Sequence, residues 1–159
     1  MNRELLAVLQ QLVLDRKIAS LGTLHGNQPF VSMVPFALAR DGSLILHVSR
    51  LASHTQDMLD HPEVSLLIAE SETSEKMAQE LARVTVQGKA QMLERDSEKH
   101  METREIYLAR FPDAAPLFEF SDFSIFIVKP ISVRLIAGFG RAVTIPGDDF
   151  VTALSEAGG

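Results

Sequence analysis

Hydrophobic residues recur along the chain in two periods, one typical of helices and one typical of strands. From residue 3 to residue 16, leucines and valines return every three or four positions, which predicts an amphipathic helix. Residues 18–25 and 30–38 are two apolar runs separated by turn residues around Gly26, so they predict a β-hairpin. Pro35 lacks a backbone N–H, which favours an edge strand or a bulge at that position.

Further apolar runs predict more short strands, with helices between some of them. The strands are expected at 43–49, 64–69, 81–93, 124–128, 132–137 and 138–142, the helices at 54–60 and 96–110, and a short helical segment at 113–118. Gly88 lies inside a strand pattern, which favours a bulge or a bend. Short strands joined mainly by tight turns, with peripheral helices, indicate a closed or partly closed antiparallel barrel.

The stretch from Leu46 to Gln56 joins a strand to a helix and has the chemistry of an anion site. Ser53 and Gln56 match a capping box, so Ser53 is the predicted N-cap. The free N–H groups and the dipole of a helix start favour a phosphate there. The side chains that add hydrogen-bond donors are Ser49, Ser53, His54 and Thr55. Alternatively, Ser53 only caps the helix and His54 is solvated.

Composition narrows the class of protein. A chain of 159 residues with 46% hydrophobic and 23% charged residues indicates one ordinary globular domain. The net charge of −6 argues against a broad nucleic-acid surface. Without cysteine, redox chemistry requires a cofactor, and the five histidines show no spacing typical of a metal site. No signal peptide or membrane span is recognisable, so a cytoplasmic location without membrane contact is expected.

Several ordered motifs carry a family resemblance that covers about residues 3–146. They are Leu21-Gly22-Thr23-Leu24, Pro29-Phe30-Val31-Ser32, residues 46–49 with 51–55, and Val86-Gln87-Gly88-Lys89-Ala90. This set resembles the FMN-binding split-barrel superfamily typified by pyridoxamine 5'-phosphate oxidase. Within this superfamily, the chain most resembles the haem-utilisation branch related to HugZ. The motifs that carry this likeness are Leu-Ala-x-His-Thr at 51–55, Phe-x-Asp-Phe at 120–123 and Gly-Phe-Gly-Arg-Ala at 138–142.

The resemblance implies a fold, a cofactor and a set of site residues. The expected fold is mainly β (α+β), a split antiparallel β-barrel of Greek-key type with peripheral helices, over residues 1–146, followed by a polar C-terminal tail at 147–159. The expected assembly is a homodimer with FMN in clefts between the subunits, and the expected function is that of an FMN-dependent oxidoreductase acting on an unknown small substrate. The implied cofactor-binding residues are Ser49, Ser53, His54 and Thr55 at the phosphate, Ser32, Met33 and Val34 along the flavin ring, and Arg83 as a polar flavin contact.

Departures from the family pattern keep alternatives open. The Arg and Lys that oxidases commonly place at the phosphate, and their C-terminal Arg and His, have no match, so vitamin B6 oxidation is disfavoured. The alternative function is that of a haem-binding or haem-degrading HugZ-like protein, or of a non-catalytic flavin- or haem-binding module. Haem-degrading relatives often carry an additional C-terminal segment that this sequence does not show. Arg141, flanked by glycine, is a candidate for binding an anionic substrate, and a surface ion pair is its alternative role.

Overall fold

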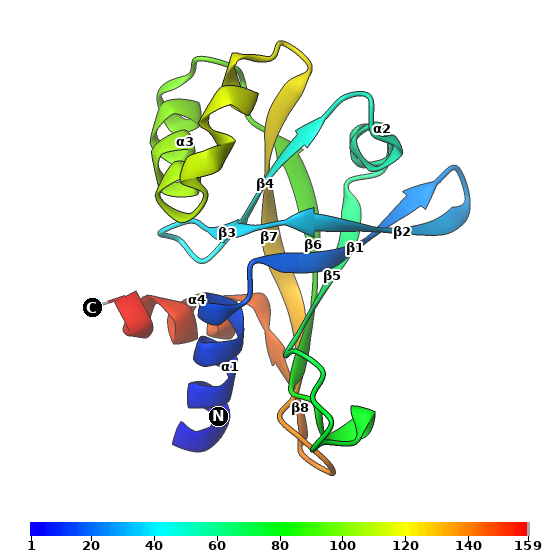
Figure 1. Cartoon of the computed structure of the whole chain (residues 1–159), viewed down its shortest axis with the longest axis vertical. Coiled ribbons are helices and arrows are strands. Elements are labelled where there is room, and N and C mark those ends of the chain that lie inside the picture. The colour runs from blue at the N-terminus through cyan, green and yellow to red at the C-terminus, as the bar shows by residue number, and fades with distance from the viewer. Residues whose placement is uncertain (159) are drawn as a thin grey trace.

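A computed structural model describes residues 1–158 of the chain. All strands belong to one curled antiparallel sheet with the order β2-β1-β5-β6-β7-β4-β3, and β8 pairs with β7 (Figure 1). The strands are β1 Ile18–His25, β2 Gln28–Pro35, β3 Ala37–Leu38, β4 Leu44–Ser49, β5 Glu63–Ala69, β6 Arg83–Met92, β7 Phe123–Ile136 and β8 Ala142–Pro146. The helices are α1 Arg3–Asp15, α2 Ser53–Asp60, α3 Glu98–Arg110 and α4 Gly147–Ser155, with 3-10 segments η1 Ala78–Glu80, η2 Pro112–Glu119 and η3 Glu156–Gly158.

The predicted hairpin is present and forms one edge of the sheet. Gly26 adopts a φ of 63° in its turn, a conformation that glycine takes without steric cost. β2 pairs with β1 on one side, and it ends at Pro35, as the missing N–H of that residue favours. The run predicted as a single strand at 30–38 is therefore split into β2 and the short β3, which turns away to pair with β4.

The long ribbon of β6 and β7 differs from the prediction of two separate strands at 124–128 and 132–137. β7 runs without interruption through Pro130 because a bulge lies opposite it, where the register shifts between Gln87 and Gly88. A Cβ at residue 88 would collide with the carbonyl oxygen of Lys129, so the close approach requires glycine. The prediction of a bulge at Gly88 is confirmed, and the bulge tolerates the proline that sequence analysis placed between two strands.

The prediction of a polar tail at 147–159 is wrong for its helical part. Residues 147–155 form α4, whose Phe150, Ala153 and Leu154 are buried in the main core. Their spacing places them on one face of the helix, while Asp148 and Asp149 face outward and gave the segment its polar character. Gly159, the last residue of that predicted tail, lies outside the described residues.

Two hydrophobic clusters hold the fold together. The main core fills the concave side of the curled sheet and includes residues of α1, α2 and α4. The second cluster lies where α3 and η2 cover β4 and β7, with Tyr107 and Phe118 against Ile125. α2 closes the end of the barrel next to the β1–β2 hairpin, and it positions the residues described next (Figure 1).

None of the helices within residues 1–158 is both long enough and apolar enough to cross a membrane.

Candidate functional site

Five of the predicted cofactor residues gather at one end of the barrel, which we call the α2 rim: Ser32, Ser49, Ser53, His54 and Thr55. β4 ends here and passes through a short turn into α2, while β2 runs alongside. The hydroxyl of Ser32 and Nδ1 of His54 lie 3.1 Å apart, within hydrogen-bond distance. The structure therefore brings together a strand and a helix that are distant in sequence, as the predicted site requires.

Two of the predicted phosphate ligands use their hydroxyl groups inside the protein. The Ser49 hydroxyl donates to Oδ2 of Asp122 at 2.7 Å and accepts a hydrogen bond from the N–H of Leu51 at 3.1 Å. Thr55 is 0% exposed, and its hydroxyl donates to the Ser49 carbonyl at 2.6 Å. Both hydroxyl groups stabilise the turn between β4 and α2. Their hydrogen bonds are made to the protein itself and not toward a ligand.

The predicted capping box is wrong. α2 begins one residue earlier than expected, its N-cap is Ala52, and no side chain caps it. The Gln56 amide donates instead to Asp60 on the next turn. The exposed Ser53 is thus not engaged as the cap, and a helix start without a side-chain cap leaves N–H groups for water or an anion.

His54 is half-buried and is the titratable residue among the five. Burial lowers the pKa of its imidazole, and the nearby Asp57 carboxylate partly opposes that change. A neutral imidazole contributes hydrogen bonds and no fixed charge. The exposed Arg50, which sequence analysis did not select, lies between Ser49 and Leu51 in the β4–α2 turn and therefore adds a cation to this part of the chain.

The three residues predicted along the flavin ring do not face one side. Ser32 and Val34 point to the concave side of the sheet, where Val34 is buried in the main core. Met33 points to the convex side and is 64% exposed. The Val34 side chain therefore packs in the core, and only its backbone remains for a ligand.

Arg83 and Arg141 lie far from the rim in the same chain. Ser49 pairs with the first residue of β7, whereas Arg83 pairs with its last, Ile136, so up to about 40 Å of strand separates them. The Arg83 guanidinium donates to the carbonyl groups of Leu81 and Gln79. Arg141 forms an ion pair with Glu4 at 2.9 Å, which is the alternative role considered for it.

A buried carboxylate next to the rim was missed by sequence analysis. Asp57 of α2 accepts hydrogen bonds from the Thr23 hydroxyl at 2.9 Å and from Nδ1 of His25 at 2.7 Å. The three residues come from α2 and β1, so their sequence positions give no common motif. The one available signal was the position of Asp57 one helical turn after His54.

His47 belongs to the second hydrophobic cluster and not to the rim. Its ring stacks on Phe118 with centroids 3.7 Å apart, and its Nδ1 has no hydrogen-bond partner within the described chain. Burial, reinforced by His100, Arg104 and Arg95, lowers the pKa of His47 to about 4. This histidine is therefore a structural residue of the second hydrophobic cluster.

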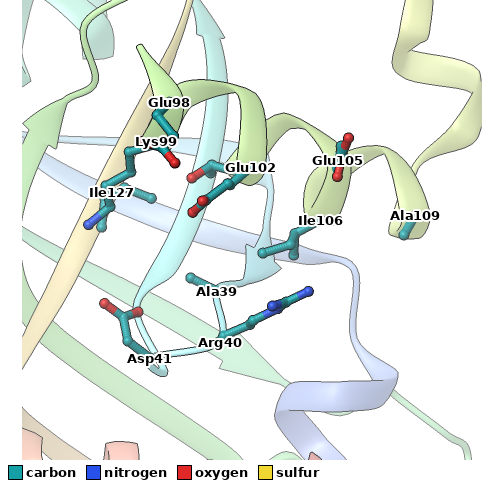
Figure 2. A pocket seen from close by; sticks show the side chains of 11 residues that line it. Ala39, Arg40, Asp41, Glu98, Lys99, Glu102, Glu105, Ile106, Ala109 and Ile127 are labelled. Carbon is teal, nitrogen blue, oxygen red and sulfur yellow. The ribbon is translucent and has the colours of Figure 1, made fainter.

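A separate cleft lies away from the rim, between α3 and the β3–β4 turn. It has a volume of about 780 Å³, and the α3 side chains face Arg40 and Asp41 across it (Figure 2). Its walls carry Glu98, Glu102 and Glu105 besides Asp41, so acidic groups outnumber the cations Arg40 and Lys99. None of the predicted site residues lines this cleft.

The curled sheet, its helices and the comparisons define the class as a split β-barrel. A pyridoxinephosphate oxidase-family protein from Clostridium acetobutylicum has the same fold, with a TM-score of 0.71 at 14% identity over 94% of this chain and 99% of that one. A haem-binding protein from Mycobacterium smegmatis gives a TM-score of 0.85 at 24% identity, over 96% of this chain and 62% of that one. At these identities the likeness concerns the fold alone.

Sequence comparison gives the family. The model of the CREG β-barrel family matches residues 3–152, and the chain belongs to this family. It is 32% identical over 139 residues to the haem oxygenase HutZ of Vibrio cholerae, covering 86% of this chain and 78% of HutZ. It is 40% identical over 121 residues to the chloroplastic non-canonical haem oxygenase HOZ of Arabidopsis thaliana, covering 76% of this chain but only 35% of HOZ. The resemblance to the haem-utilisation branch is thereby confirmed.

Proposed function

We propose that this chain binds haem at the α2 rim. The observation that carries the proposal is the 32% identity to the haem oxygenase HutZ across 86% of the chain. The relative HOZ, 40% identical over 121 residues, is also a haem oxygenase. Haem thus takes first place among the ligands considered, ahead of the FMN that sequence analysis placed first.

The surface of the rim suits a flat, amphiphilic ligand. Phe30 on β2, Leu51 in the β4–α2 turn and Phe120 before β7 are exposed apolar side chains. The hydroxyl of Ser32 and the imidazole of His54, which are 3.1 Å apart, are polar groups of the same rim. Apolar surface for a macrocycle and polar groups for its carboxylates are the two requirements that haem imposes on a binding surface.

Each rim residue has a specific role in this proposal. The N–H groups at the start of α2, together with Ser53 and Arg50, bind a carboxylate, because the helix dipole and the guanidinium both favour negative charge. Ser32 and His54 donate or accept hydrogen bonds at the ligand edge. Asp122 holds Ser49 and thereby the shape of the turn. Bound haem would supply the redox-active iron, which the polypeptide lacks.

FMN is the second candidate, supported by the same uncapped helix start and by the fold of the oxidase-family neighbour. An oxidoreductase activity through FMN remains a prediction. The two ligands make different demands, since FMN presents a phosphate and haem presents two carboxylates, and a titration separates them.

We also propose that the chain forms the expected homodimer, and apolar residues on the convex face of the sheet support this proposal. Val31 is 68% exposed and lies beside the exposed Met33, Leu67 and Ile131 on that face. A hollow of about 450 Å³, lined by residues of β1, β2, β5, β6 and β7 that include Val31 and Ile131, lies here. We assign a second copy of the chain to this face, because only a partner can bring Arg83 near the rim residues of the first chain.

Equilibrium titrations test the rim. The purified chain and the variant Ser53→Ala/His54→Ala are titrated with ferric haem and, separately, with FMN. The double variant should bind haem about 10-fold or more weakly, while His61→Ala, at the far end of α2, should match the unmodified chain. Equal haem affinity of all three proteins would contradict binding at the rim, and tight binding of FMN without haem binding would favour the second candidate.

A further inference from the structure

Asp57 and His25 form a carboxylate–imidazole pair that none of the roles above uses. The Asp57 side chain is 4% exposed, whereas that of His25 is 62% exposed. A carboxylate is an acceptor only, so the 2.7 Å contact with Nδ1 requires a proton on that nitrogen. The lone pair of the neutral imidazole is therefore on Nε2.

The second oxygen of the carboxylate is also occupied. The Thr23 hydroxyl donates to Oδ2 at 2.9 Å, so Asp57 is held from both sides and the His25 ring is held by it. No hydrogen bond to Nε2 is formed within residues 1–158. These two hydrogen bonds join α2 to β1, and this structural clamp is enough to explain the buried carboxylate. It does not explain why one partner is an exposed imidazole whose Nε2 has no partner.

No other histidine of the chain has this arrangement within the described residues. His47 is buried under Phe118. Burial lowers the pKa of the half-buried His100; the Asp96 carboxylate opposes that change, Arg95 and Arg104 add to it, and no carboxylate lies within ion-pair distance of the ring in the described residues. His54 has a serine hydroxyl as its partner, and His61 ends α2 without a carboxylate at its ring. An imidazole that ligates a metal typically donates its other N–H to a carboxylate or a carbonyl, which orients the ring and strengthens the donor nitrogen.

The pair also lies beside the proposed haem surface. Asp57 follows Ser53 by four residues, about 6 Å along the helix axis. The ring of Phe30, one of the exposed apolar side chains of the rim, has its centroid 5.8 Å from that of His25. One flat ligand can therefore contact both the start of α2 and the His25 ring.

We propose that Nε2 of His25 is the protein ligand of the haem iron, and that Asp57 is the positioning residue that sets its tautomer. This inference rests on the proposed haem binding and adds the ligand atom. It assigns to the β1–β2 hairpin a role that no motif of the sequence indicated. The donor set fits iron, since a proximal histidine is a common haem ligand.

Resonance Raman spectra of the ferrous haem complex test this assignment directly. The unmodified chain should show an iron–histidine stretching band, His25→Ala should lose it, and added imidazole should restore it. Asp57→Asn should keep the band but shift it to lower frequency, because an amide oxygen accepts the Nδ1–H hydrogen bond more weakly than a carboxylate and leaves Nε2 a weaker donor to iron. The same variant should bind haem about 10-fold more weakly. His61→Ala is the matched control and should behave as the unmodified chain.

The outcomes separate this inference from the proposed function. If the unmodified chain binds haem, and His25→Ala keeps both the affinity and the iron–histidine band, His25 is not the ligand and haem binding stands. If the unmodified chain binds no haem, both proposals are wrong. Circular dichroism and thermal unfolding of each variant check the fold, and a purely structural clamp would lower the unfolding temperature of Asp57→Asn without moving the band.

Discussion

Protonation of His47 should couple the stability of the α3–η2 face to pH. The folded state holds the pKa of His47 at about 4, against 6.5 for an exposed histidine, chiefly because the ring is buried. The unfolded chain therefore binds a proton at a higher pH than the folded chain does. The contribution of a neutral His47 is complete above pH 6.5 and is lost as the pH falls toward 4.

The magnitude follows from the difference between the two pKa values. It corresponds to at most about 3 kcal/mol of the free energy of unfolding, for a residue that is 6% exposed. Replacing His47 by Phe removes the titration and keeps an aromatic ring on Phe118. Nδ1 of His47 makes no hydrogen bond in the folded chain, so the replacement breaks none. The variant should therefore be at least as stable as the unmodified chain at pH 7.

Urea denaturation at several pH values between 7.5 and 4, read by circular dichroism, measures the effect. Carboxylates and other histidines titrate in both proteins, so the difference between the two curves isolates His47. The unmodified chain should lose about 3 kcal/mol more than His47→Phe over this range. Parallel curves would refute the assignment of a buried neutral imidazole.

Three further predictions concern the sheet, the last helix and the convex face. Gly88→Val should destabilise the chain in guanidinium denaturation, because its Cβ would collide with the Lys129 carbonyl, and an unchanged midpoint would contradict the bulge. Phe150→Ala should cost about 3–5 kcal/mol by the same assay, and a loss under 1 kcal/mol would mean that α4 is not docked in the core. Val31→Glu should convert a dimer to a monomer in light scattering, while Met101→Glu on the exposed side of α3 should not; a monomeric unmodified chain would contradict the dimer.

Local patterns were sufficient to predict most elements of the barrel. Two apolar runs separated by turn residues predicted the hairpin, and an isolated glycine predicted the bulge at Gly88. The errors arose where tertiary context overrides local signals. Pro130 reads as a strand break, but the bulge accommodates it, and Asp148 and Asp149 gave α4 a polar appearance although its other face is buried.

The candidate site was only partly visible in sequence. The β4–α2 turn has a recognisable composition, so Ser53 and His54 were selected before the fold was known. The commitment of the Ser49 hydroxyl to Asp122 depends on residues 73 positions apart, and the pairing of His25 with Asp57 spans 32 positions. Such partners become adjacent only through strand register and helix docking, which composition does not encode.

The central claim is that this chain binds haem, and the visible absorption spectrum during haem addition tests it most directly. The purified chain, mixed with increasing ferric haem, should develop a Soret band that saturates at a fixed ratio of haem to protein. An equal excess of FMN should not displace that band. A spectrum that remains the sum of free haem and protein at every ratio would contradict the account.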